Sequence, residues 1–396
     1  MNDLSNRLMS LSESETLVMS QKSAELKAQG VDVINLSVGE PDFSTPEHIK
    51  EAAKKAIDDN FSFYSPVTGF LDLRKAICDK LKKENNLTYA PDQIVCSNGA
   101  KQSVCNVILA IVSKGDEVII PAPYWVSYPE MVTLADGKSV SVYAGIEQDF
   151  KITAAQLEEA ITPKTKALIL CSPSNPTGSV YSKDELSALA DVLAKYPNII
   201  IISDEIYEHI NYLGSHESIA QFENIRERVV IVNGVSKGYA MTGWRLGFVA
   251  AAKWIVDAID KLQGQVTSGT NSIAQRAAVV AFEDMSAPAM MKEAYLRRRD
   301  LVVGLLKDIE GFKVNTPEGA FYAFPDVSYY YGKSDGTTTI KNGDDLSMWI
   351  LEKAFVATVA GSGFGAPNCI RISTAAADEV LVEAVQRIKD LLSTLK

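Results

Sequence analysis

The middle of the chain alternates short, unbroken apolar runs with amphipathic stretches, and this alternation constrains the fold more than any other feature. The apolar runs are 93–97, 117–120, 167–171, 199–202 and 229–232. Short runs rich in isoleucine and valine are typical of strands that are buried on both faces. Strands of this kind separated by helices form βαβ units, so we predict an α/β fold with a mostly parallel sheet flanked by helices.

One intervening helix carries its own start and stop signals. Ser182 and Glu185 form an S-x-x-E capping box, leucines follow on one face, and Pro197 ends the pattern. The two ends of the chain look different, with longer helical stripes. The helices predicted there are 16–29, 293–307 and 381–395. The strands predicted there are 320–324, 355–360 and 369–373.

These differences predict two domains, which suits a chain of 396 residues. We expect a large domain over 46–288 and a smaller α+β domain built from both termini, over 1–45 and 289–396. Residues 329–345 are rich in tyrosine, glycine and threonine, so we expect a surface loop there.

The charge and the reactive side chains exclude several classes of protein. A net charge of −11 argues against binding to nucleic acid or to an anionic membrane surface. No stretch reaches the ~18–20 apolar residues that span a bilayer, and the polar N-terminus does not resemble a secretory signal. The five cysteines are scattered and the three histidines form no zinc motif, so we expect reduced thiols, no metal site and a cytoplasmic location.

Polar residues follow the predicted strands at their carboxyl ends, where open parallel sheets bind ligands. Gly99 and Ala100 open a helix, whose backbone N–H groups suit a phosphate. Asn175 lies in the turn SNPTG, and Asp204 ends a buried run, where an acid needs a cation. Taken singly, each feature also fits an ordinary turn or an internal ion pair.

Lys237 and Arg245 sharpen the interpretation. Lys237 follows the fifth apolar run between small residues, where a buried amine loses its proton more readily and becomes a nucleophile. Arg245 lies among small and apolar residues and calls for an anion. With Asn175, Asp204 and Tyr207, this set matches what pyridoxal phosphate needs: an amine, an anion for the ring nitrogen, donors for the ring oxygen and cations for the phosphate.

The sequence resembles the class I aminotransferases, which are fold type I pyridoxal-phosphate enzymes, and within them the bacterial aspartate aminotransferase subgroup. The matching segments extend over nearly the whole chain: NLSVGEPDF at 35–43, YSP at 64–66, PAPYW at 121–125, SNPTG at 174–178, SDEIY at 203–207, the lysine segment 236–247 and IRIS at 370–373. The resemblance implies a seven-stranded, mostly parallel sheet in the large domain. It also implies a homodimer with its sites at the subunit interface.

The resemblance further implies a role for each matching residue. Lys237 would bind the cofactor covalently and act as the catalytic base, with Asp204 and Tyr207 as its catalytic partners. The other cofactor contacts would be Gly99, Ala100, Trp125, Asn175, Arg245 and, from the other subunit, Tyr64. The substrate contacts would be Gly39, Lys101, Trp125, Asn175 and Arg371, the last gripping the α-carboxylate.

Lys101 bears on the choice of substrate. In this subgroup a lysine at that place contacts the distal carboxylate, so we expect amino transfer from aspartate to 2-oxoglutarate, giving oxaloacetate and glutamate by a ping-pong route. A solvated lysine on a helix face is the alternative. Broader specificity for alanine, aromatic amino acids or prephenate stays open, as does a C–S lyase. Ser12 lies where prephenate-accepting members carry a basic residue, so we expect no prephenate activity.

Two rival classes are weaker. Residues 361–366 satisfy a loose G-x-G-x-x-A pattern, but Pro367 and a predicted strand follow where a nicotinamide-binding helix should begin. A non-enzymatic regulator would need a DNA-binding appendage, and the chain has no spare basic helix for one.

Overall fold

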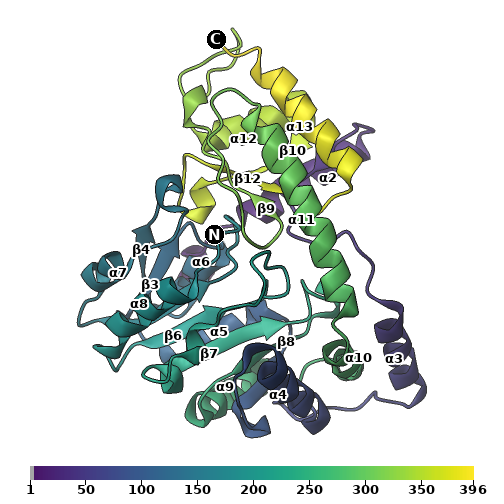
Figure 1. Ribbon diagram of the computed structural model, residues 1–396, viewed down its shortest axis with the longest axis vertical. Coiled ribbons are helices and arrows are strands. Elements are labelled where there is room, and N and C mark those ends of the chain that lie inside the picture. Colours follow the sequence, from purple (N-terminus) through teal and green to yellow (C-terminus); the bar gives the residue numbers. More distant parts are fainter. Residues whose placement is uncertain (1–3) are drawn as a thin grey trace.

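The computed structural model describes residues 4–396, and its largest element is a seven-stranded mixed sheet (Figure 1). The strand order is β2-β8-β7-β6-β5-β3-β4, and β8 runs antiparallel to both of its neighbours. The strands are β2 (Ile94–Ser97), β3 (Glu117–Ala122), β4 (Lys138–Tyr143), β5 (Thr165–Cys171), β6 (Ile200–Asp204), β7 (Val229–Gly234) and β8 (Gly247–Ala250). All five predicted runs are strands of this sheet, which confirms the fold class.

The inner strands carry continuous apolar runs because helices cover both faces of the sheet. In β7, Val229 and Ile231 pack into one core, while Val230 and Val232 pack into the core on the opposite face. The first face is covered by α3 (Glu47–Asp58), α4 (Leu71–Asn85), α7 (Ala154–Ala160), α8 (Lys183–Ala194) and α10 (Ser272–Glu283). The second face is covered by α5 (Ala100–Ile111), α6 (Ser127–Leu134) and α9 (Lys253–Val266). The capping box predicted for α8 is confirmed, with Ser182 and Glu185 bonded reciprocally.

A second, smaller core combines segments from both ends of the chain. Its helices are α11 (Ser286–Lys307), α12 (Gly343–Ala354) and α13 (Asp378–Leu392), and α2 (Glu15–Ala28) packs beside it. In a short three-stranded sheet, the central strand β12 (Ile370–Ser373) pairs with β11 (Val359–Ala360) on one side and with β9 (Tyr322–Ala323) on the other. A second pairs β1 (Ile34–Asn35) with β10 (Val356–Ala357) and so joins the two ends of the chain. The smaller α+β part is thus confirmed.

Details of this part differ from the prediction. The run 355–360 forms two short strands in different sheets, and only two residues of 320–324 are extended in a sheet. The long helix α11 extends from beside the large sheet to α13 (Figure 1). The predicted domain boundary at residue 288 lies in the first turn of this helix and stays a prediction.

Residues 331–342 form the expected irregular excursion, whereas 343–345 already belong to the first turn of α12. Ser334 exchanges backbone hydrogen bonds with Lys396, which fastens the last described residue to this loop. Across residues 4–396, none of the helices has the length and apolar character required to cross a bilayer.

Candidate active site

A cavity of about 360 Å³ lies where the carboxyl ends of β5, β6 and β7 face the smaller core. Most residues predicted for the site line it: Gly39, Ala100, Lys101, Trp125, Asn175, Asp204, Tyr207, Lys237, Arg245 and Arg371. Gly99 lies beside it as the N-cap of α5. Tyr64 does not line it, because its side chain is 97% exposed on the surface.

Lys237 lies just after β7, is half-buried and lines the cavity. The amine donates a hydrogen bond to the Gly39 carbonyl, with 2.6 Å between Nζ and the oxygen. Burial lowers the pKa of Lys237 to about 8, because a desolvated ammonium loses more hydration energy than a neutral amine. Much of the amine is therefore neutral and nucleophilic at slightly alkaline pH.

Asp204 ends β6 and is also buried. Its Oδ2 accepts a hydrogen bond from the Tyr128 hydroxyl at 2.6 Å, and its Oδ1 accepts one from the Ile206 N–H at 3.2 Å. Burial raises the pKa of Asp204 to about 6. A cation in the cavity next to this carboxylate would stabilise its charged form.

Tyr128 was missed by the sequence analysis. It lies three residues after Trp125 at the start of α6, and the two rings meet edge to face with 5.3 Å between centroids. Trp125 lies two residues before the helix begins, so the three-residue spacing carried no helix-face signal for Tyr128.

The N-terminus of α5 and Arg245 form a corner suited to a phosphate. Gly99 has φ +80°, and a Cβ there would overlap the Arg245 guanidinium. Likewise, a Cβ on Gly247 would overlap the backbone N of Ala100. Arg245 donates to the carbonyl oxygens of Thr242 (3.0 Å) and Asn98 (3.1 Å), which are neutral and leave its positive charge available to an anion.

Arg371 lies at the opposite side of the cavity on β12 and is 2% exposed. Its guanidinium donates to Asn175 Oδ1 at 2.9 Å and to the Ser37 carbonyl at 2.6 Å, and both acceptors are neutral. Its Nε is buried and has no hydrogen-bond partner among residues 4–396. A buried arginine with a spare donor and neutral partners favours a ligand carboxylate, which would supply the missing acceptors.

Lys101 lies in the first turn of α5, with Nζ 5.0 Å from the centroid of the Trp125 ring. Its side chain is exposed at the mouth of the cavity. Partial desolvation, and then the nearby charge of Arg245, lower the pKa of Lys101.

Comparison with known proteins agrees with this arrangement. The family model described as aminotransferase class I and II matches residues 31–388. The chain belongs to this family. The resemblance drawn from the motifs is thereby confirmed, and the family as a whole uses pyridoxal phosphate.

Individual relatives in the family match the full length of the chain. A bifunctional aspartate aminotransferase and glutamate/aspartate-prephenate aminotransferase from Petunia hybrida is 48% identical over 99% of this chain and 83% of its own length. An aspartate/prephenate aminotransferase from Nitrosomonas europaea is 46% identical over 98% of this chain and 100% of its own. The aspartate aminotransferase of Rhizobium meliloti superposes with a TM-score of 0.97 at 40% identity, covering both chains completely. That of Thermus thermophilus, solved with maleate, gives 0.92 at 39% identity over 99% of this chain and 100% of its own.

Other residues that line the cavity of this aminotransferase were not predicted. Ser14, Thr16 and Leu17 approach from the start of α2, and Tyr322 from the smaller core. Ser12, by contrast, is exposed, and its backbone N–H donates to Glu130 Oε2 at 2.9 Å. The start of α2 and Tyr322 are about 300 residues apart in the sequence, so no local sequence pattern could predict that they line the same cavity.

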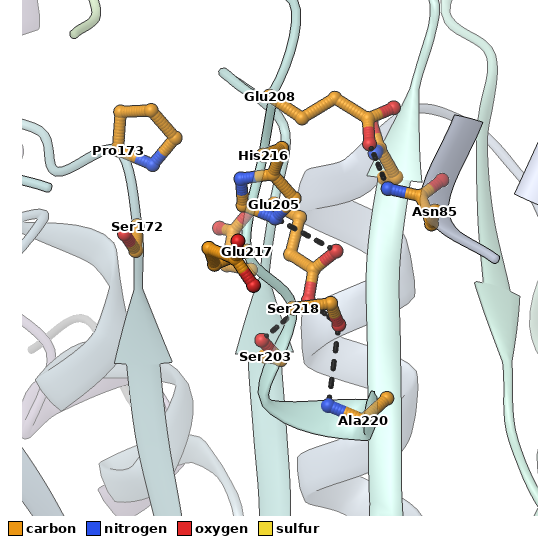
Figure 2. Close-up of polar contacts among 12 residues, drawn as sticks. Asn85, Ser172, Pro173, Ser203, Glu205, Glu208, His216, Glu217, Ser218 and Ala220 are labelled. Atoms are coloured by element: carbon orange, nitrogen blue, oxygen red, sulfur yellow. Dashed lines mark hydrogen bonds and ion pairs between the residues drawn. The ribbon is translucent and has the colours of Figure 1, made fainter. Parts of the chain in front are cut away.

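An ionic cluster that includes Glu205, Glu208 and His216 lies beside the strands of the large sheet (Figure 2). Glu205 accepts from Ser203 (2.8 Å) and Ser218 (2.6 Å) and lies 3.1 Å from His216 Nε2. Glu208 forms an ion pair with Lys80, which supplies a positive charge to the cluster. The sequence analysis found no histidine motif and therefore did not predict this cluster, in which His209 and His216 lie close to three glutamates.

Proposed function

We propose that this protein transfers the amino group of aspartate to 2-oxoglutarate, using pyridoxal phosphate bound at Lys237. The observation that carries the proposal is the buried Arg371, whose Nε lacks a partner and which faces the same cavity as Lys237 and Asp204. The names of the full-length relatives support aspartate as the substrate.

The residues present fit the cofactor. Lys237 offers a half-buried amine of lowered pKa, and Asp204 a buried carboxylate for the ring nitrogen. Asn175 and Tyr207 offer two groups for the ring oxygen. The corner of Gly99, Ala100 and Arg245 would hold the phosphate, and Trp125 would stack on the ring. When bound, pyridoxal phosphate supplies an electron sink for the carbanion formed at the substrate Cα.

The chain's own residues would then manage binding and proton transfer. Asp204, held by Tyr128, keeps a proton on the ring nitrogen because an adjacent anion favours the charged form of the ring. Arg371 fixes the substrate α-carboxylate in a bidentate grip, with Asn175 orienting the guanidinium. Lys237 Nζ would act as the base that takes the α-proton from the substrate and holds it as an ammonium for return. Release of a 2-oxo acid before the second acceptor binds gives ping-pong kinetics.

Lys101 would select dicarboxylic substrates by pairing with the distal carboxylate, while the backbone near Gly39 closes over the substrate. The exposed Tyr64 would reach the phosphate in a partner subunit, so we propose a homodimer with sites at the interface. We also propose a cytoplasmic enzyme, in keeping with its five free cysteines.

Prephenate as an amino acceptor is a second candidate, because the Nitrosomonas relative carries that activity in its name. The side chains that line the cavity from the N-terminal segment, Ser14, Thr16 and Leu17, are not basic, and Ser12 is exposed. We therefore expect prephenate to be a poor acceptor, which initial rates with prephenate and aspartate would measure.

Lys101→Gln tests the proposed substrate. We expect kcat/KM for aspartate to fall by roughly 10–100-fold, because a charge-assisted bond worth ~1.5–3 kcal/mol is lost, while the value for alanine changes little. Lys183→Gln, an exposed lysine at the start of α8, is the matched control. An equal loss for both amino acids in Lys101→Gln would contradict the selectivity proposed for Lys101.

A further inference from the structure

Tyr322 touches both halves of the proposed site, although no motif marks it. It lies on β9 of the smaller core, is 1% exposed and lines the cavity. Its hydroxyl oxygen is 2.7 Å from that of Tyr207, which follows β6 of the large sheet. One face of its ring lies 4.7 Å from the Arg371 guanidinium carbon.

We propose that Tyr322 is a positioning residue that joins the cofactor side of the site to the substrate side. Its hydroxyl donates to Tyr207 and strengthens Tyr207 as a hydrogen-bond donor to the cofactor's ring oxygen. Its ring face holds the Arg371 guanidinium in the plane that a carboxylate requires. This inference rests on the proposed function of the same cavity.

The hydroxyls of Tyr207 and Tyr322 can form a chain of hydrogen bonds that ends on the cofactor. Tyr207 has one O–H proton, and once it donates that proton to a ring oxygen its own oxygen can accept from Tyr322. Each hydroxyl in such a chain polarises the next, which strengthens the terminal bond by roughly 10–30%. Both hydroxyls are buried, so water does not compete for them.

Two aromatic rings flank the guanidinium of Arg371. Its guanidinium lies 4.7 Å from the Tyr322 ring and 4.9 Å from the Phe364 ring. Its two hydrogen bonds, to Asn175 and Ser37, fix two of its nitrogens. The aromatic faces restrict the remaining rotation out of plane, so the guanidinium is oriented before a substrate arrives.

The first test uses the absorption bands of the bound cofactor, titrated with pH in the absence of substrate. Tyr207→Phe should raise the midpoint by about 1–2 pH units, because a donor to the anionic ring oxygen is lost. Tyr322→Phe should raise the midpoint by about 0.1–0.6 pH unit, because only the strengthening of the Tyr207 hydrogen bond by the Tyr322 hydroxyl is lost. In the Tyr207→Phe background, Tyr322→Phe should add nothing, because the relay acts through Tyr207.

Tyr295→Phe is the matched control. Tyr295 lies in the same buried aromatic cluster as Tyr207 and Tyr322, and its hydroxyl has no hydrogen-bond partner in the described part of the chain. Its removal should leave the midpoint unchanged.

The second test separates the ring from the hydroxyl by the binding of succinate, an unreactive dicarboxylate, to the loaded enzyme. Tyr322→Phe keeps the ring and should bind succinate as the wild type does. Tyr322→Leu removes the ring face and should weaken binding by about 2–30-fold.

An unshifted midpoint in Tyr322→Phe, the same shift with and without Tyr207, or wild-type succinate binding in Tyr322→Leu would overturn the inference. In each case the proposed function would survive, provided that the wild type binds the cofactor and Tyr207→Phe shifts its titration. A wild type that takes up no pyridoxal phosphate would instead refute the proposed function itself.

Discussion

Lys237→Met should stabilise the cofactor-free protein, although the same substitution should abolish its activity. Burial lowers the pKa of Lys237 from 10.5 in its ordinary state to about 8. The folded protein therefore holds this proton less tightly than the unfolded chain does. The resulting destabilisation is complete below about pH 8 and disappears as the pH rises toward 10.5.

The size of the effect follows from that shift. About 2.5 pH units correspond to about 3 kcal/mol of lost stability at pH 7. Methionine removes this cost but cannot donate to the Gly39 carbonyl, which offsets about 1 kcal/mol. The net gain is about 2 kcal/mol at pH 7. At pH 9.5 only about 1 kcal/mol of the original cost remains, so nearly all of the gain disappears.

Equilibrium urea unfolding of the cofactor-free protein, at equal protein concentration and at pH 7 and 9.5, measures both values. Lys183→Met, on the exposed first residue of α8, serves as the control and should change the free energy of unfolding by less than about 0.5 kcal/mol. A Lys237→Met variant that is no more stable than the wild type at pH 7, or whose gain is the same at both pH values, would refute the reasoning.

Three further predictions concern the same residues. Asp204→Asn should bind the cofactor but lose at least roughly 100-fold in kcat with aspartate, because the amide cannot keep the ring nitrogen protonated; near-normal turnover would exclude this role. Tyr128→Phe removes a hydrogen bond that lowers the pKa of Asp204, so the acid limb of the kcat/KM profile should move to higher pH, whereas an unmoved limb would separate Tyr128 from Asp204. The rate at which cofactor-free protein takes up pyridoxal phosphate should rise with pH and level off above about 8, as Lys237 becomes neutral; a rate that does not depend on pH would contradict this.

The strand–helix alternation predicted the large sheet well because each inner strand is buried on both faces. Two strands of the sheet were not predicted, for different reasons. The edge strand β4 alternates between exposed and half-buried residues, and β8 is a short segment that begins at Gly247. In the smaller core, strands of two residues are set by pairing between the two ends of the chain, which no local pattern encodes.

The site could be predicted as far as its residues follow strands. Asp204 and Lys237 stand directly after buried runs, so their position was readable from the sequence. Tyr128 and Tyr322 act through other side chains and approach from a helix and from the smaller core, so only the folded chain reveals them. The same holds for the ionic cluster, where His209 lies beside Glu208 and the distant Glu84, and His216 lies beside Glu205 and Glu208.

Borohydride reduction of the protein loaded with pyridoxal phosphate, followed by peptide mapping, tests the central claim most directly. We expect one stable phosphopyridoxyl label per chain, on the peptide that contains Lys237. An unlabelled protein, or a label confined to another lysine, would contradict it.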